Sequence, residues 1–190
     1  MPKDALRALA EIGGLNKLST HRRAALWESE RAPLPADDLF AALQVREDSP
    51  LLPMTPHERL TADYSRTHMT TGPHPMALIR DQLPDVWRAS DLEKAPDGTH
   101  VRVAGAVICR QRPGTAKGFM FISLEDETGV ANAILTPQMF EQHRLTVTHE
   151  GFLSIIGRVQ HRHGVIHIKA DSIEGLACRP VANVASHDFH

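Results

Sequence analysis

The spacing of apolar residues changes near residue 99 and divides the chain into two kinds of structure. Upstream, Leu6, Leu9 and Ile12 recur every three positions, which is typical of a helix with one buried face. Downstream, apolar residues alternate with others, as around Val101 and Val103, which predicts strands. We therefore expect an α+β protein, in which a small helical part and a connector precede a β domain.

The segment 1–30 predicts two short helices. Gly13-Gly14 ends the first one. Ser19 or Thr20 can cap a second helix, which then runs through Trp27. Two helices of this length bury too little apolar surface for a core of their own. The segment is therefore expected to be the end of a larger helical domain, or an arm that packs against one.

Residues 31–98 are predicted to form a proline-rich linker followed by connector helices. Five prolines fall within residues 31–56, which prevents a long helix and favours extended chain. At most a short helix over Pro35–Leu43 is expected to interrupt this stretch.

Helix-start signals follow the linker. Thr55 and Glu58 have the spacing of a capping box, and Pro56 suits the first helical position, so a helix is expected from there to about Thr67. A further short helix is expected over 76–83, and the capping pattern is repeated at 90–93, before a turn at 96–98.

Residues 99–175 predict a strand-rich domain. The expected elements are strands over 101–108, 119–125 and 130–135, a helix over 137–143, and strands over 152–162 and 165–173. This order is that of the OB-fold, a five-stranded Greek-key barrel, and Gly105 suits the bend of its long first strand. A β-sandwich is the alternative, but it has no natural place for the helix. Residues 176–190 lack periodicity and are expected to form a flexible tail.

Composition narrows the class of protein. The 190 residues are 42% apolar and 23% charged, and no uncharged apolar stretch approaches the length of a membrane span. The N-terminus lacks the apolar segment of a secretory signal, and Cys109 and Cys178 suggest no disulfide framework. We therefore expect a cytoplasmic protein without membrane contact. The formal net charge of −2 excludes the broad basic field of a strong duplex-DNA binder.

Basic and aromatic residues of the β domain indicate a weak surface for single-stranded nucleic acid, which OB barrels bind across the second and third strands and the flanking loops. Phe119 and Phe121 share the strand face opposite Met120 and Ile122, where they are candidates to stack on bases. The candidate phosphate-binding cations are Arg110, Arg112, Lys117, Arg158, His161, Arg162 and Lys169. Such cations also occur on ordinary solvated surfaces, so a barrel that docks a protein partner is the alternative.

Catalytic and metal-binding patterns are weak by comparison. The glycines of segment 114–118 lack the spacing of a phosphate-binding loop. The acids of segment 125–127 are adjacent in a predicted turn, so their side chains do not converge on two metal ions. His161, His163 and His167 share one strand face, but no carboxylate or cysteine completes a zinc site nearby. We expect no catalysis, metal or cofactor in this chain.

Several strings of the sequence resemble the C-terminal region of bacterial error-prone DNA polymerases, which are relatives of the C-family replicase α-subunit. The strings RQRPGTAKG at 110–118 and LEDETG at 124–129 resemble their OB domain. The segment His21–Trp27 resembles the end of their helix-hairpin-helix region, 54–76 their connector, and 186–190 their terminus.

This resemblance implies a role in translesion synthesis, DNA repair and damage-induced mutagenesis. It implies that the catalytic carboxylates, and the Mg²⁺ of the full-length polymerase, belong upstream, so that this chain would be an accessory part that does not polymerise. Ala36 stands where the replicase clamp motif has glutamine, before Asp37-Asp38-Leu39-Phe40. The resemblance therefore implies indirect contact with the sliding clamp, through an inactive Y-family-like mutasome partner. A standalone single-strand-binding module is the alternative.

Overall fold

The computed structural model describes residues 2–31, 48–162, 164–176 and 187–189. Of residues 187–189 only the backbone is described. The chain divides into two compact units, Met1–Thr70 and Thr71–His190. Within the described residues, no helix is long and apolar enough to cross a membrane.

Several sequence predictions fall outside the described residues, among them those for His163 and for 177–186 of the tail. Others concern the short helix over Pro35–Leu43, the segment Ala36–Phe40 at the place of the clamp motif, and Cys178.

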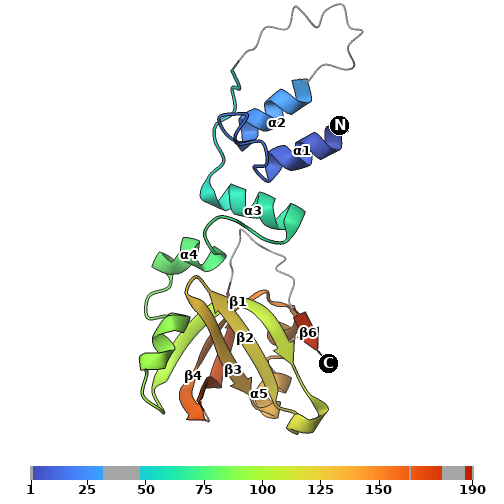
Figure 1. Ribbon diagram of the computed structural model, residues 1–190. Helices are drawn as coiled ribbons and strands as arrows, with labels where there is room; N and C mark the ends of the chain where they lie inside the picture. Colours follow the sequence, from blue (N-terminus) through green and yellow to red (C-terminus); the bar gives the residue numbers. More distant parts are fainter. Residues whose placement is uncertain (1, 32–47, 163, 177–186, 190) are drawn as a thin grey trace, which may run out of the picture. The chain divides into compact units, whose positions relative to one another are not determined.

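In its described residues, 2–31 and 48–70, the first unit has three helices, α1 (Lys3–Glu11), α2 (Arg22–Arg31) and α3 (Pro56–Thr67) (Figure 1). Helix α1 packs against both α2 and α3. The expected cap of α2 at Ser19 or Thr20 is wrong: the imidazole Nδ1 of His21 accepts the N–H of Ala24 at 3.0 Å instead. Helix α2 consequently starts later than expected, and it also ends later.

Helix α3 follows the local sequence closely. The Thr55 hydroxyl accepts the Glu58 N–H at 3.2 Å, and the Glu58 carboxylate accepts the Thr55 N–H at 2.8 Å, which completes the expected capping box. His68, in the left-handed region at φ 58°, ends the helix.

The second unit begins with connector elements that belong to the barrel. These are α4 (Pro75–Ile79), the 3₁₀ turn η2 (Arg80–Gln82) and the 3₁₀ helix η3 (Ala89–Lys94). Leu92 and Ala95 lie in the barrel core, and α4 contacts β1 and β2. The boundary therefore lies near residue 71 and not at 99, because residues that were expected in the connector complete the packing of the barrel.

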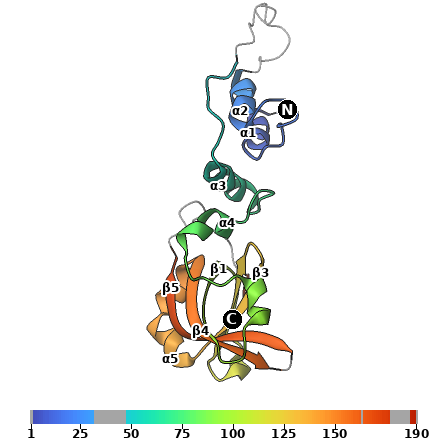
Figure 2. The ribbon, with the colours of Figure 1, turned by 90° about the vertical axis from the view of Figure 1, so that its left-hand side faces the viewer.

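Five strands close into the expected OB barrel (Figure 1). They are β1 (His100–Gln111), β2 (Met120–Asp126), β3 (Gly129–Leu135), β4 (Phe152–Arg162) and β5 (Val165–Gly175). Strand β1 pairs with both β2 and β4, β3 pairs with β2 and β5, and the β4–β5 hairpin completes the circle (Figure 2). Only the β3–β5 contact is parallel among these five strands.

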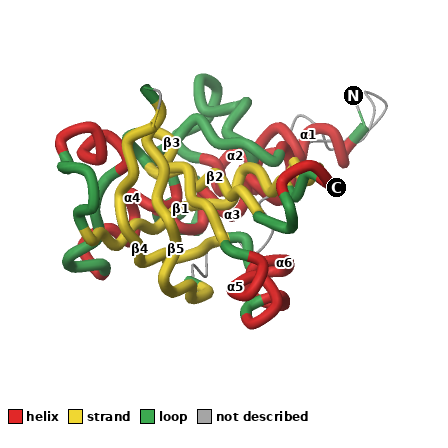
Figure 3. The backbone as a smooth tube through the Cα atoms, turned by 90° about the horizontal axis from the view of Figure 1, so that it is seen from below, coloured by secondary structure: helices red, strands yellow, loops and turns green. Residues whose placement is uncertain are grey.

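The barrel core follows the alternation read from the sequence. Met120, Ile122 and Leu124 on β2 are buried inside, while the two residues between them are half-buried. Two helices lie between β3 and β4, α5 (Pro137–Gln142) and α6 (Arg144–His149), and they contact each other (Figure 3). Helix α6 was not expected; its Val147 and the Phe140 of α5 join the core.

Gly105 marks a close approach of two strands. A Cβ at this position would lie 2.6 Å from the Glu125 carbonyl oxygen, so only glycine lets β1 pass over β2 here. The register shift of β1 comes slightly later, between Val107 and Cys109. Gly105 is therefore needed for this close approach, and the bulge of β1 lies beyond it.

The C-terminal segment is not wholly a tail. Residues His187–Phe189 form a short strand, β6, which pairs in parallel with Cys109–Gln111 of β1. The free edge of β1 beyond its pairing with β4 is thus covered by the chain itself.

Candidate nucleic-acid interface

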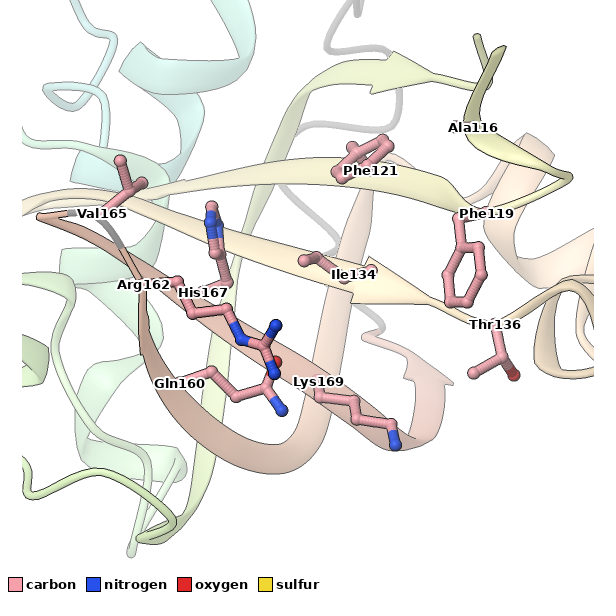
Figure 4. A pocket seen from close by; sticks show the side chains of 10 residues that line it. All are labelled: Ala116, Phe119, Phe121, Ile134, Thr136, Gln160, Arg162, Val165, His167 and Lys169. Carbon is pink, nitrogen blue, oxygen red and sulfur yellow. The ribbon is translucent and has the colours of Figure 1, made fainter. Parts of the chain in front are cut away.

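An open groove crosses the outer face of the barrel over β2, β3, β5 and β4 (Figure 4). Its volume of about 740 Å³ is within the range of ligand-binding clefts, about 300–1,000 Å³. The lining residues are Ala116, Phe119, Phe121, Ile134, Thr136, Gln160, Arg162, Val165, His167 and Lys169.

The groove has an apolar side and a cationic side. Strands β2 and β3 contribute Phe121 and Ile134, which are directly opposite each other in the register. Ile134 is in turn opposite Lys169 of β5, and Lys169 is opposite Arg158 of β4. Opposed residues in a sheet point to the same face, so this row runs from an aromatic ring to two cations.

The two phenylalanines lie where the alternation predicted. Phe121 is half-buried on β2, and Phe119, just before the strand, is 38% exposed. Figure 4 shows both rings on the groove, with Phe119 beside Thr136, and with Phe121 and Lys169 on opposite sides of Ile134. Neither ring enters the barrel core, which Met120 and Ile122 fill from the opposite strand face.

Two of the predicted cations, Arg162 and Lys169, line the groove on β4 and β5. Arg158 shares their strand face, and it lies beside the groove without lining it. Among the lining residues there is no carboxylate. The cationic side therefore has the charge that suits a phosphate backbone.

Arg110 is the clearest correction to the predicted surface. It is only 7% exposed, its Nε donates to the Val147 carbonyl oxygen at 2.7 Å, and its Nη2 donates to that of Glu150 at 2.6 Å. These carbonyls lie at the end of α6, the helix that the sequence did not predict. Arg110 therefore caps this helix from β1 and does not face the groove.

Three more predicted residues are not among those that line the groove. Arg112 stacks over the ring of Phe140 on α5. Lys117 is exposed in the loop between β1 and β2, at φ 51°. The ring Nε2 of His161 lies 2.8 Å from the Ala95 carbonyl oxygen. The structure thus brings together four of the nine predicted residues and places Arg158 next to them.

Sequence reasoning missed six of the residues that line the groove, Ala116, Ile134, Thr136, Gln160, Val165 and His167. The signal was present in the register, since Gln160 is opposite His167 and Arg162 is opposite Val165. Residues that alternate with the buried positions of β4 and β5 must share the face of Lys169.

The acidic turn between β2 and β3 is used within the fold. Arg80 of η2 donates to Glu127 at 2.8 Å and to Asp126 at 3.1 Å. Burial opposes ionisation of both carboxyls, but hydrogen bonds outweigh it and lower their pKa values. At Asp126 these hydrogen bonds come from Thr128 and the Ala89 N–H, and at Glu127 from Arg80. Among the residues that the structure describes, no three His, Cys, Asp or Glu side chains gather as metal ligands would.

Comparison with known proteins agrees with this architecture. Residues 91–176 match the model of the family described as "OB-fold nucleic acid binding domain". A protein of Anaeromyxobacter dehalogenans named error-prone DNA polymerase is 40% identical over 185 residues, which cover 96% of this chain and 16% of that protein. A protein of the same name from Aromatoleum aromaticum is 38% identical over 188 residues, which cover 97% of this chain and 18% of that protein.

Among solved structures, asparaginyl-tRNA synthetase from Pyrococcus horikoshii is similar with a TM-score of 0.34 and 24% identity, over 41% of this chain and 20% of that one. The chain thus contains an OB-fold domain, and almost all of it is similar to error-prone DNA polymerases, of which it spans less than a fifth.

Proposed function

We propose that the groove binds single-stranded DNA, and that the chain is an accessory part of an error-prone DNA polymerase, where it holds the template strand. The observation that carries this proposal is the division of the groove into an aromatic side and a cationic side, on an OB barrel. A single strand offers both surfaces at once, because its bases are unpaired and its phosphates lie along one edge.

In the proposed complex the bases lie on β2 and β3. The exposed Phe119 and the half-buried Phe121 both line the groove, and stacking of a base on an aromatic side chain is worth about 1–3 kcal/mol. Ile134 extends this apolar floor between Phe121 and the cations. Stacking is available to every base, so binding is expected to depend little on sequence.

The phosphates then follow β4 and β5. Arg162 and Lys169 line this side of the groove, and Arg158 extends the cationic row beyond it. Few cations are involved and the formal net charge of the chain is −2, so we expect weak binding that high salt abolishes.

The relatives' name supports the role in the polymerase, and we propose that nucleotidyl transfer takes place outside this chain. The acids that are adjacent in sequence, Asp126 and Glu127, are engaged by Arg80, which does not suit two-metal catalysis. Primer extension with Mg²⁺ and all four nucleotides tests this point; template-dependent synthesis by the purified chain would overturn it.

Fluorescence anisotropy with an oligo-dT strand at several salt concentrations tests the groove. The slope of log K against log salt is negative, and each lost phosphate contact reduces its magnitude by about 0.7 for a single strand. The double variant Arg162→Ala/Lys169→Ala should therefore reduce this magnitude by about 1.4, while Phe119→Ala weakens binding about 5- to 150-fold with the slope unchanged.

Lys94→Ala provides the control, since Lys94 pairs with Asp91 at the surface and is not a lining residue. If the wild-type chain fails to bind even at low salt, the proposal fails, and the barrel is better regarded as a docking module for a mutasome partner.

A further inference from the structure

We infer that Arg112 is a positioning residue: it fixes the loop 113–118 on α5 and so places Phe119 at the wall of the groove. The inference rests on the single-strand binding proposed above. It assigns to Arg112 a role through Phe119, where the sequence suggested a direct phosphate contact.

Arg112 contacts two residues of α5. Its guanidinium carbon lies 4.3 Å from the centroid of the Phe140 ring, and Nη2 lies 3.6 Å from a carboxylate oxygen of Glu141. Phe140 is 8% exposed and belongs to the barrel core, so it is a fixed platform. The charge of Arg112 is thereby partly neutralised before any phosphate approaches.

The loop after Arg112 is short and closes on itself. The Ala116 N–H donates to the Pro113 carbonyl at 2.9 Å, and the Phe119 N–H donates to the Ala116 carbonyl at 3.0 Å. Lys117 and Gly118 are the central residues of the second turn, and both lie in the left-handed region, at φ 51° and 83°. The direction of the chain at Phe119 therefore depends on where the loop is seated.

The surroundings of Gly118 show which helix the loop packs against. A Cβ at Gly118 would lie 3.3 Å from the Pro137 ring at the start of α5, and 3.8 Å from Nη2 of Arg112. Arg112 thus reaches across the base of the loop to the same helix that the loop packs against. With Arg112 removed, the proline contact remains, but the stacked guanidinium that ties the loop to Phe140 is lost.

A salt-slope measurement separates this role from a direct phosphate contact. Arg112→Ala should weaken oligo-dT binding about two- to fivefold, which corresponds to one exposed cation–π contact, and leave the salt slope unchanged. Combined with Phe119→Ala it should add little, because the ring that it positions is gone. A slope smaller in magnitude by about 0.7, with effects that add, would overturn the inference and make Arg112 a phosphate ligand.

A second readout needs no DNA. Hydrogen exchange of the Phe119 and Ala116 amides in the free chain should become about two- to fivefold faster in Arg112→Ala, and less so in Arg112→Lys, which keeps the charge but lacks the planar group. Arg162→Ala is the matched control and should leave both amides unchanged. Unchanged exchange in Arg112→Ala would refute the positioning role, whereas faster exchange in a chain that binds no DNA would refute only the proposed function.

Discussion

The two units of the chain are stabilised in different ways. Among the described residues of the first unit, the buried apolar side chains are three alanines and one leucine, and Leu18 and Leu52 are 82% and 78% exposed. The barrel of the second unit buries aliphatic side chains on each of β1 to β5, among them the long side chains of Leu124, Ile155 and Ile168. The first unit instead joins its helices by pairs of arginine and carboxylate.

This difference concerns cooperativity as much as stability. The barrel connects residues far apart in sequence, so loss of one core contact is felt by all five strands. In the first unit, Arg66–Glu11 and Arg23–Glu58 lie at the surface, where an ion pair contributes about 0–1 kcal/mol. The ion pair of Arg22 and Asp63 is buried, with Nη1 2.6 Å from Oδ1, and it joins α2 to α3.

Asp63→Ala is expected to have the largest effect. The Asp63 side chain is 7% exposed and also accepts the Thr70 hydroxyl at 2.7 Å, so its removal leaves the Arg22 guanidinium buried without its charge partner. Breaking such a pair costs about 3–5 kcal/mol. Residue-resolved hydrogen exchange should show lost protection in the first unit and unchanged protection in β1–β5. Asp4→Ala, which removes an exposed partner of Arg7, is the control.

Ile155→Ala should give the second largest effect, in the other unit. Ile155 is fully buried in the core on β4, and truncation of such a residue costs about 2–5 kcal/mol. Denaturant unfolding should shift its midpoint, with protection reduced across all strands together. Loss restricted to β4 and β5 would show that the barrel is less cooperative than this comparison holds.

Acid should act on the second unit through the β2–β3 turn. The pKa values of Asp126 and Glu127 are lowered in the fold, so the stability that they contribute is complete above about pH 5 and is lost as the pH falls through the folded-state values. The midpoint of denaturant unfolding, followed from pH 6 to pH 3, should therefore fall. Arg80→Met, which removes the partner of both acids, should show a smaller fall; an equal fall would exclude this turn as its source.

Local signals made much of the fold predictable, and long-range ones decided the rest. The α3 capping box depends on residues three apart, and the inward face of β2 on a period of two, so both could be read from the chain. Arg110 could not, because its partners, the carbonyls of Val147 and Glu150, lie about forty residues away on a helix with few local signals. His167 differs from Arg110: it alternates with the buried Ile168 and shares the strand face of Lys169, so the period of two could have placed it on the groove.

Removal of the α3 cap tests the first unit more gently. Thr55→Ala deletes the hydroxyl that accepts the Glu58 N–H and should cost about 1 kcal/mol. Because so little core supports this unit, exchange of the α3 amides should accelerate about fivefold. Thr55→Ser, which keeps the hydroxyl, should restore protection; if it does not, packing of the threonine methyl and not the cap is responsible.

The smallest expected effect is a pH dependence at the start of α4. The Nδ1 of His74 accepts the Met76 N–H at 3.2 Å, which requires the ring to be unprotonated there. Burial lowers the pKa of His74, against the attraction of Glu125, Glu127 and Asp126 and with the repulsion of Arg80.

Because the pKa is lowered on folding, the contribution of His74 is complete above about pH 6.5 and declines as the pH falls below it. Between pH 7.5 and 5.5, exchange of the α4 amides should accelerate, by less than the loss of the Thr55 cap. In His74→Asn, an amide that caps without titrating in this range, the acceleration should disappear while α4 persists. If it persists in this variant, the pH dependence belongs to another group of the second unit.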